Sequence, residues 1–89
     1  SVTCYLEKMD QDKDKVHLQV LVVVDRDNLK KILIGKNGSM MKRVGMEARQ
    51  DLEEYFQKRV YLETYVKTIE NWRDKQKYLK ELGLDELDS

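Results

Sequence analysis

Two stretches near the start of the chain alternate between apolar and polar residues, as half-buried β-strands do. In residues 2–7, Val2, Cys4 and Leu6 occupy alternate positions, so we expect these three side chains to face the core, with Cys4 as a small buried hydrophobe. Residues 16–24 alternate in the same way and are apolar on both faces in their later half. The intervening residues 9–15 (MDQDKDK) are polar and have no period. The pattern predicts an antiparallel hairpin whose second strand is covered on both sides, or uses one side for binding.

The period then changes to that of helices. We expect a short helix over residues 28–34, with Asp27 as its N-cap and with Leu29, Ile32 and Leu33 facing inward. Gly35 ends this helix. A second helix, capped by Ser39, is predicted to extend to about Phe56, with an apolar stripe at spacings of three and four: Met41, Val44, Ala48, Leu52, Tyr55 and Phe56.

One residue inside this second helix does not suit it. Gly45 costs about 1 kcal/mol relative to alanine in a helix interior. We expect a close crossing by another element at this position.

The remainder of the chain predicts one more strand and one more helix. Residues 59–67 alternate again, with Val60, Leu62, Thr64 and Val66 on one face and Tyr61, Glu63, Tyr65 and Lys67 on the other. A helix over about residues 69–82 has Ile69, Trp72, Gln76, Leu79 and Leu82 on one side, and Gly83 is a suitable C′ residue.

These elements define a fold class. Two helices connect the second and third strands, and such a crossover favours parallel pairing. The prediction is an α+β fold in which a mixed three-stranded sheet packs against helices, in one domain over residues 1–83. The acidic tail, residues 84–89, is expected to be frayed.

Composition limits the class of protein further. The chain has 89 residues, which is room for one modest core. Its longest apolar run, Val20–Val24, is far shorter than the roughly 20 residues of a membrane-spanning helix. We see no secretory signal, and the single cysteine favours a reducing, cytoplasmic compartment.

A formal net charge of zero conceals an uneven distribution. Residues 26–49 carry seven basic and two acidic side chains, a net charge of +5, whereas residues 1–25 carry −2 and residues 50–89 carry −3. A basic segment between acidic flanks indicates an anionic partner at one place on the surface, although an ordinary solvated helix face would have the same composition.

The turn between the two central helices, Gly35-Lys36-Asn37-Gly38, lies inside this basic segment. Glycine reaches positive φ and lets a ligand approach the backbone. The turn brings backbone N–H groups to the N-terminus of a helix, where the helix dipole favours anions, and Lys36 adds a positive charge. Such a turn can clamp a sugar-phosphate backbone, as the GXXG loop of KH domains does, but helix-turn-helix connections also use glycine for geometry alone.

Two other nucleotide-related interpretations fit less well. A Walker A motif needs more residues before its lysine and a strand before its turn. In a DNA-reading helix-turn-helix, the second helix would begin with base-reading side chains, but it begins with Met40 and Met41. Apolar residues around the turn instead suit a shallow groove for unstacked bases. We expect Ile34, Met40 and either Val22 or Val24 to line it, and the groove's rim to carry Lys30, Lys31, Lys42 and Arg43.

The segment Ile34–Lys42, together with residues spaced along most of the chain, resembles the C-terminal KH domain of the bacterial GTPase Era family. The further matching positions are Gly45, Ala48-Arg49, Asp51-Leu52, Val60-Tyr61-Leu62-Glu63, Val66-Lys67 and Trp72-Arg73, and Ser1-Val2-Thr3 resembles the start of the domain's first strand. The resemblance implies a type II KH fold, of which the family's N-terminal helix is absent here. The family often has glycine where this chain has Asn37, and asparagine also tolerates the left-handed region.

This resemblance also implies a function. Family members bind single-stranded RNA near the 3′ end of small-subunit ribosomal RNA during maturation of the small ribosomal subunit, and they carry a GTPase domain upstream. Carried over to this chain, the backbone clamp is Gly35, Lys36, Asn37 and Gly38, followed by Ser39. GTP and Mg²⁺ belong to the upstream domain, so we expect no cofactor, no metal and no enzymatic activity in this chain. We expect a cytoplasmic monomer, with peripheral association of full-length members with the inner membrane also implied.

The remaining polar and aromatic residues favour structural roles. His17 has no partner at metal-ligand spacing, and the Asp10, Asp12, Asp14 series lacks the glycine and the final glutamate of an EF-hand loop. Tyr61 and Tyr65 could stack bases, but packing under the last helix, against Trp72, is the expectation. A protein-docking module that uses the basic segment, or a duplex-DNA reader, are the alternatives to RNA binding.

Overall fold

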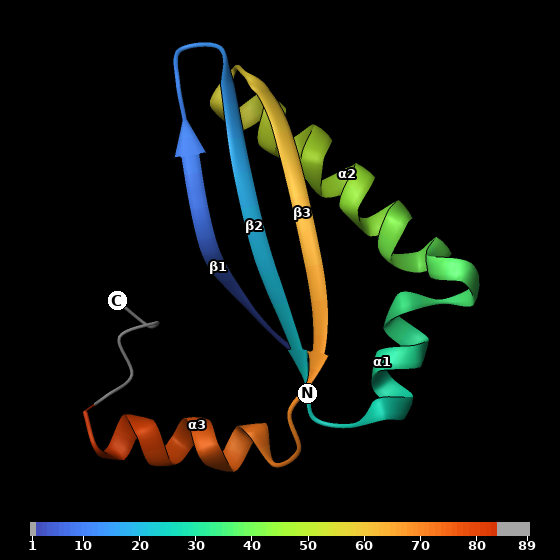
Figure 1. The fold of residues 1–89 in the computed structure, drawn as a ribbon, viewed down its shortest axis with the longest axis vertical. Coiled ribbons are helices and arrows are strands. Elements are labelled where there is room, and N and C mark those ends of the chain that lie inside the picture. The colour runs from blue at the N-terminus through green and yellow to red at the C-terminus, as the bar shows by residue number, and fades with distance from the viewer. Residues whose placement is uncertain (1, 84–89) are drawn as a thin grey trace.

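The computed structural model describes residues 2–83, and it confirms the predicted α+β class and element order (Figure 1). The predicted tail, residues 84–89, lies outside the described residues. The elements are β1 (Val2–Gln11), β2 (Lys15–Val24), α1 (Asp27–Ile34), a 3₁₀ turn η1 (Lys36–Gly38), α2 (Ser39–Phe56), β3 (Arg59–Thr68) and α3 (Trp72–Glu81).

The three strands form one mixed sheet in the order β1-β2-β3. β1 pairs antiparallel to β2, and β2 pairs parallel to β3, as the crossover predicts. β1 is longer than expected, because Met9 and Gln11 still pair with Leu18 and Val16 although the side chains in this part are mostly polar. Backbone pairing does not require an apolar side chain, so the polar segment 9–11 belongs to the strand and not to the turn.

The turn between β1 and β2 is organised by Asp12. Its carboxylate accepts hydrogen bonds from the N–H groups of Asp14 (2.8 Å) and Lys15 (2.9 Å). These two bonds lower the pKa of Asp12, because they stabilise its ionised form. Asp12 and Asp14 therefore belong to a turn, whereas Asp10 lies in β1, and no group of three potential metal ligands gathers anywhere in residues 2–83.

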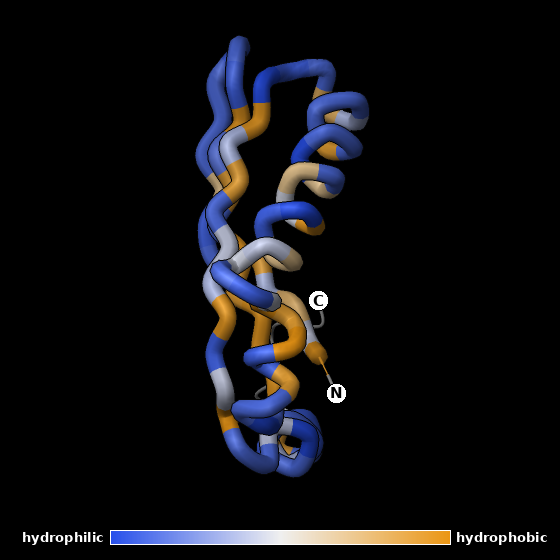
Figure 2. The backbone as a smooth tube through the Cα atoms, turned by 90° about the vertical axis from the view of Figure 1, so that its right-hand side faces the viewer, coloured by the Kyte–Doolittle hydropathy of each residue, from blue (hydrophilic) through white to orange (hydrophobic). Residues whose placement is uncertain are grey.

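The core lies between the sheet and α2. Val16, Leu18 and Val60 are buried there, and Leu52, Phe56 and Leu62 pack against them. Both α1 and α2 lie on the same side of the sheet, as Figure 2 shows. Glu53 of α2 also fixes this packing, because its carboxylate accepts the backbone N–H of Val60 (2.9 Å) and a bond from Arg49 (3.0 Å).

The apolar face of β1 is not covered by these helices. Cys4 is exposed, and the side chains of Val2 and Leu6 are 49% and 55% exposed. The prediction that these three residues face the core was wrong, because α1 and α2 pack mainly over β3, at the opposite edge of the sheet. The inward positions predicted for Ile32, Val44 and Tyr55 were also wrong, because each of these side chains lies on the solvent side of its helix.

Helix ends also differ from the expected ones. Arg26 occupies the N-cap position of α1 and Gly38 that of α2, and neither helix has a side-chain cap bond, so Asp27 and Ser39 are first helical residues. α3 begins at Trp72, because the N–H of Ile69 still bonds to the carbonyl of Val24 (2.8 Å) and prolongs the sheet. Gly83 follows α3 with φ of 71°, as predicted for C′.

The last helix covers only one end of the other sheet face. Trp72 packs edge-on against Tyr5, with ring centroids 5.9 Å apart, and Gln76 donates a hydrogen bond to the Tyr5 hydroxyl (2.8 Å). Leu79 and Leu82 remain exposed. Tyr61 and Tyr65 are exposed too, so their predicted packing against Trp72 was wrong. Within residues 2–83, no helix combines the length and apolar character that a membrane crossing requires.

Candidate functional site

The turn between α1 and α2 has a backbone that depends on its residue types. Gly35 adopts φ 76° and ψ 177°, Asn37 φ 56° and ψ 28°, and Gly38 φ 76° and ψ 11°. A Cβ atom on Gly35 would lie 2.8 Å from the Cβ and 2.9 Å from the backbone nitrogen of Met40. Gly35 is therefore required for two reasons, its φ and its contact with the start of α2. Asn37 reaches the left-handed region that asparagine tolerates best among residues with a side chain.

Part of the hydrogen-bonding capacity of this turn is used internally. The N–H of Gly35 bonds to the carbonyl of Lys31 (2.9 Å), and that of Gly38 bonds to the carbonyl of Gly35 (3.2 Å). Ser39 donates to the carbonyl of Lys36. The N–H groups of Lys36 and Asn37 are the first two of the 3₁₀ turn, so neither has an acceptor inside that turn, and neither bonds to a loop residue or a side chain within residues 2–83. Two amides, from two exposed residues, thus remain for a ligand.

The basic side chains predicted for the rim lie on the turn and on the two helices that flank it. Lys31, Lys36, Lys42 and Arg43 are exposed, and Lys30 is half-buried. Arg43 forms a surface ion pair with Glu47 (3.7 Å), whereas none of the four lysines has an ion-pair partner in the described part of the chain. Ile34 is half-buried, and Ser39 and Met40 are exposed beside the turn. The four lysines therefore give the turn and its flanking helices an excess of unpaired positive charge.

A shallow groove of about 300 Å³ begins within one helical turn of the Gly35–Gly38 turn. It lies between α2 and β3 and is lined by Met41, Lys42, Gly45, Met46, Arg49, Leu62 and Thr64. Nothing lies within 4 Å of the position of a Cβ on Gly45, so this glycine leaves the groove open and does not mark a helix crossing. The expected crossing was wrong. Of the lining residues, only Lys42 was predicted, although Met41, Gly45 and Arg49 share one face of the helix at spacings of four.

Val24 does not belong to this surface. Its side chain is completely buried, and Val22 is nearly so. β2 is the central strand and is paired on both sides, so its backbone has no free edge for a ligand. The predicted groove wall along the second strand was wrong, because the pattern of alternation does not give the order of strands. The free edge nearest to α2 belongs to β3.

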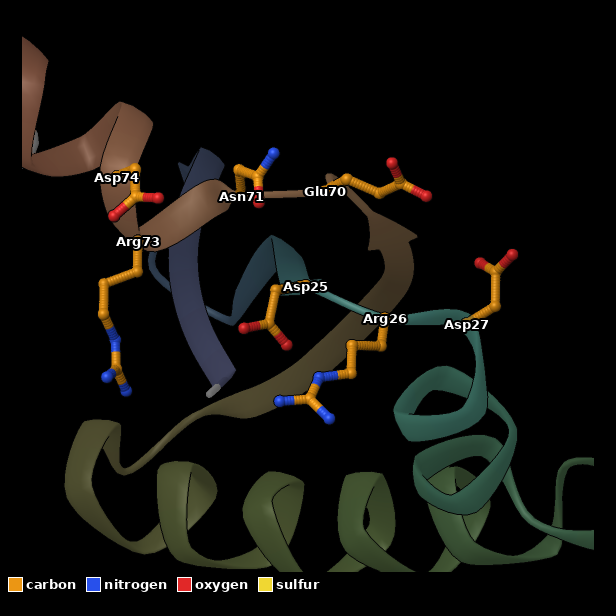
Figure 3. Close-up of a pocket in the computed structure, with 7 residues that line it drawn as sticks. All are labelled: Asp25, Arg26, Asp27, Glu70, Asn71, Arg73 and Asp74. Carbon is orange, nitrogen blue, oxygen red and sulfur yellow. The ribbon is translucent and has the colours of Figure 1, made fainter.

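A larger cavity, of about 620 Å³, lies where the chain leaves β2 and β3 (Figure 3). Its lining residues come from the β2–α1 and β3–α3 connections: Asp25, Arg26, Asp27, Glu70, Asn71, Arg73 and Asp74. Four carboxylates and two guanidinium groups give it a mixed, mainly acidic character. An anionic ligand therefore fits the Gly35–Gly38 turn better than this cavity.

Comparison with known proteins finds a matching family and similar solved structures. A family model described as "KH domain" matches residues 2–73. Two solved structures are similar at 33% identity: Era from Aquifex aeolicus, as a variant bound to GDP·AlF₄⁻ (TM-score 0.81), and Era in complex with MgGDPNP and nucleotides 1506–1542 of 16S ribosomal RNA (TM-score 0.82). Each match covers 94% of this chain but only 29% of the other chain, so this chain spans less than a third of those proteins.

Proposed function

Because this chain belongs to the KH domain family, we propose that its Gly35–Gly38 turn binds the sugar-phosphate backbone of single-stranded RNA. The observation that supports this most directly is the pair of unbonded amides at Lys36 and Asn37, at the N-terminus of α2. Phosphate oxygens accept bonds from such amides, and the helix dipole adds to the attraction.

The groove beside the turn suits the bases of the same RNA. Met41, Met46 and Leu62 offer apolar contacts, and Thr64 offers a hydroxyl. Lys42 and Arg49 offer cations for phosphates, although Arg49 is already bonded to Glu53 (3.0 Å). Unstacked bases that enter this groove lie beside the free edge of β3. Backbone groups at that edge can bond to base edges, which gives a means of sequence preference.

The target that the comparisons favour is small-subunit ribosomal RNA. One of the similar structures contains nucleotides 1506–1542 of 16S ribosomal RNA together with MgGDPNP. We propose that this chain is the RNA-binding module of an Era-like GTPase that acts on the 3′ end of that RNA in small-subunit maturation. GTP and Mg²⁺ would then bind outside the region that this chain matches, and the protein would act in the cytoplasm beside the ribosomal subunit.

The test replaces both free-amide residues with acidic ones. Lys36→Asp with Asn37→Asp places negative charge where the phosphate would lie, on an exposed turn, so we expect a native circular dichroism spectrum and loss of RNA binding. The probe is a synthetic RNA that corresponds to nucleotides 1506–1542. If roughly four phosphates are contacted, log K falls with log [salt] with a slope of about −3.

A matched control is available at α3, which has Asn71 as its N-cap and Lys77 within it. Asn71 has φ of 58°, close to the 56° of Asn37, so both are asparagines in the left-handed region. Asn71→Asp with Lys77→Asp therefore makes the same change in charge, with one aspartate again in the left-handed region, away from the Gly35–Gly38 turn. This control should bind RNA as the unmodified chain does. Equal affinity of all three proteins would refute the clamp. Binding without preference for single strands over duplexes, or binding only to acidic proteins, would favour the docking alternative.

A further inference from the structure

The sheet face turned away from α1 and α2 carries a row of exposed aromatic rings. Tyr61 and Tyr65 of β3 lie on this face and are 44% and 49% exposed. His17 of β2 pairs with Tyr61, and their ring centroids are 5.7 Å apart. α3 lies at one end of the strands (Figure 1) and meets this face near Tyr5. The rest of this face is open to planar partners that stack on aromatic rings.

Hydrogen-bonding groups lie between the two tyrosines. The carboxylate of Glu63 accepts a bond from the Tyr65 hydroxyl (3.1 Å), and it lies 3.3 Å from Nε2 of His17. Donating this bond raises the pKa of the Tyr65 hydroxyl, because ionisation would break the bond and place a second negative charge beside Glu63. A shallow hollow of about 140 Å³ adjoins these groups and is lined by Lys8, Asp10, His17, Gln19 and Glu63. Carboxylates accept bonds from the amino groups of bases.

The net charge of this face is small, so it neither repels a polyanion such as RNA nor attracts one strongly. Four basic residues lie on it or at its margin (Lys8, Lys15, Arg59 and Lys67), together with three acidic ones (Glu7, Asp10 and Glu63). The net charge is therefore close to +1. Affinity on this face must come from the rings, as it does where single-stranded nucleic acids stack on aromatic platforms.

Strand β3 connects this face to the groove beside the Gly35–Gly38 turn. It is an edge strand, with Leu62 and Thr64 in the groove and Tyr61 and Tyr65 on the opposite face. At about 3.3 Å per residue, the two tyrosines are roughly 13 Å apart along the strand. An RNA that leaves the groove around the free edge of β3 reaches both rings.

We propose that this open face is a second contact surface for single-stranded RNA, where Tyr61 and Tyr65 stack bases of nucleotides beyond those held at the Gly35–Gly38 turn. The choice of RNA as the ligand rests on the proposed function. A sheet with exposed aromatic residues is a means by which proteins bind unstacked bases, since every base has a face that can stack.

The test compares two lengths of RNA, one of about five nucleotides, enough for a clamp on four, and one about three times as long. Tyr61→Ala and Tyr65→Ala should each weaken binding of the longer RNA by roughly five- to a hundredfold and leave the shorter one unchanged. Tyr61→Phe and Tyr65→Phe keep the ring and should retain most of the affinity. Tyr55→Ala, at a tyrosine of α2 that is 80% exposed, is the matched control and should change neither.

A measurement on the unmodified chain covers the case in which an alanine variant fails to fold. Ring proton signals of Tyr61 and Tyr65 should shift on addition of the longer RNA and not of the shorter one. If they do not shift, or if the folded double alanine variant binds the longer RNA as the unmodified chain does, the second surface is refuted. In that case, loss of both RNAs by the Lys36→Asp, Asn37→Asp variant would still support the clamp. Failure of the unmodified chain to bind either RNA would overturn both proposals.

Discussion

The two glycines of the Gly35–Gly38 turn should respond very differently to the same substitution, although they have equal φ. Gly35 combines φ 76° with ψ 177°, a region essentially restricted to glycine, whereas Gly38 lies at φ 76° and ψ 11°, in the left-handed region. A Cβ on Gly35 would meet the backbone of Met40 at 2.9 Å, but a Cβ on Gly38 would meet nothing within 4 Å.

These differences give the magnitude. Gly38→Ala costs about 1–2 kcal/mol for the left-handed conformation, and the reduced entropy of the unfolded chain offsets roughly 0.4–1 kcal/mol of it. Gly35→Ala costs about 1–3 kcal/mol for its region of conformational space, and the first turn of α2 must also shift to relieve the contact with Met40. We therefore expect a loss of about 2–4 kcal/mol for Gly35→Ala and of about 0.5–1 kcal/mol for Gly38→Ala.

Urea unfolding followed by circular dichroism measures this difference. With an m-value of about 1–1.5 kcal/mol/M for a chain of this size, the midpoint of Gly35→Ala should lie roughly 1 M or more below that of Gly38→Ala. RNA affinity should follow the same order, because moving the start of α2 moves the amides of Lys36 and Asn37. Equal midpoints for the two variants would refute the assignment of a packing role to Gly35.

Three further predictions concern the scaffold. An NMR titration should show that Asp12 ionises below its ordinary pKa of 3.8. Because the folded-state pKa is lowered, the contribution of Asp12 to stability is fully present above pH 3.8 and is lost as the pH falls through the folded-state value. Asp12→Ala should remove this pH dependence, and a variant that unfolds in acid with the same profile as the unmodified chain would contradict the prediction. Glu53→Ala should lower the free energy of unfolding by about 1–3 kcal/mol, because the N–H of Val60 loses its acceptor, and unchanged urea stability would contradict this. Trp72→Ala should release α3 from Tyr5, so that amides of α3 exchange with solvent while those of α2 stay protected; equal protection of both helices would contradict it.

The sequence predicted the elements and the candidate turn, because both are local. Alternation identified the strands, the two helices made a crossover that implies parallel pairing, and Gly35 with Gly38 marked the turn. Strand order and helix placement are not local. Cys4 has the alternation of a buried residue, yet it is exposed, because its strand lies at the edge that α1 and α2 do not cover. Periodicity shows which residues share a face, and packing decides whether that face is covered.

The same limit explains the errors in the candidate site. Val24 was placed in the groove because it is an apolar residue of a strand whose later half is apolar on both faces, but that strand is central and the side chain is buried. Tyr61 and Tyr65 were expected to be covered, because the reach of α3 could not be predicted from its period. Gly45 was recognised as unusual, but whether a helical glycine marks a crossing or an opening depends on what lies across from it, and here there is open space.

The most direct test of the central claim is an NMR titration of the backbone amides with the RNA of nucleotides 1506–1542. If the turn holds the phosphates by its free N–H groups, the signals of Lys36 and Asn37 move most. Gly35, whose N–H already bonds to Lys31, should move less. Saturable binding that leaves the Lys36 and Asn37 amides unmoved would contradict the account.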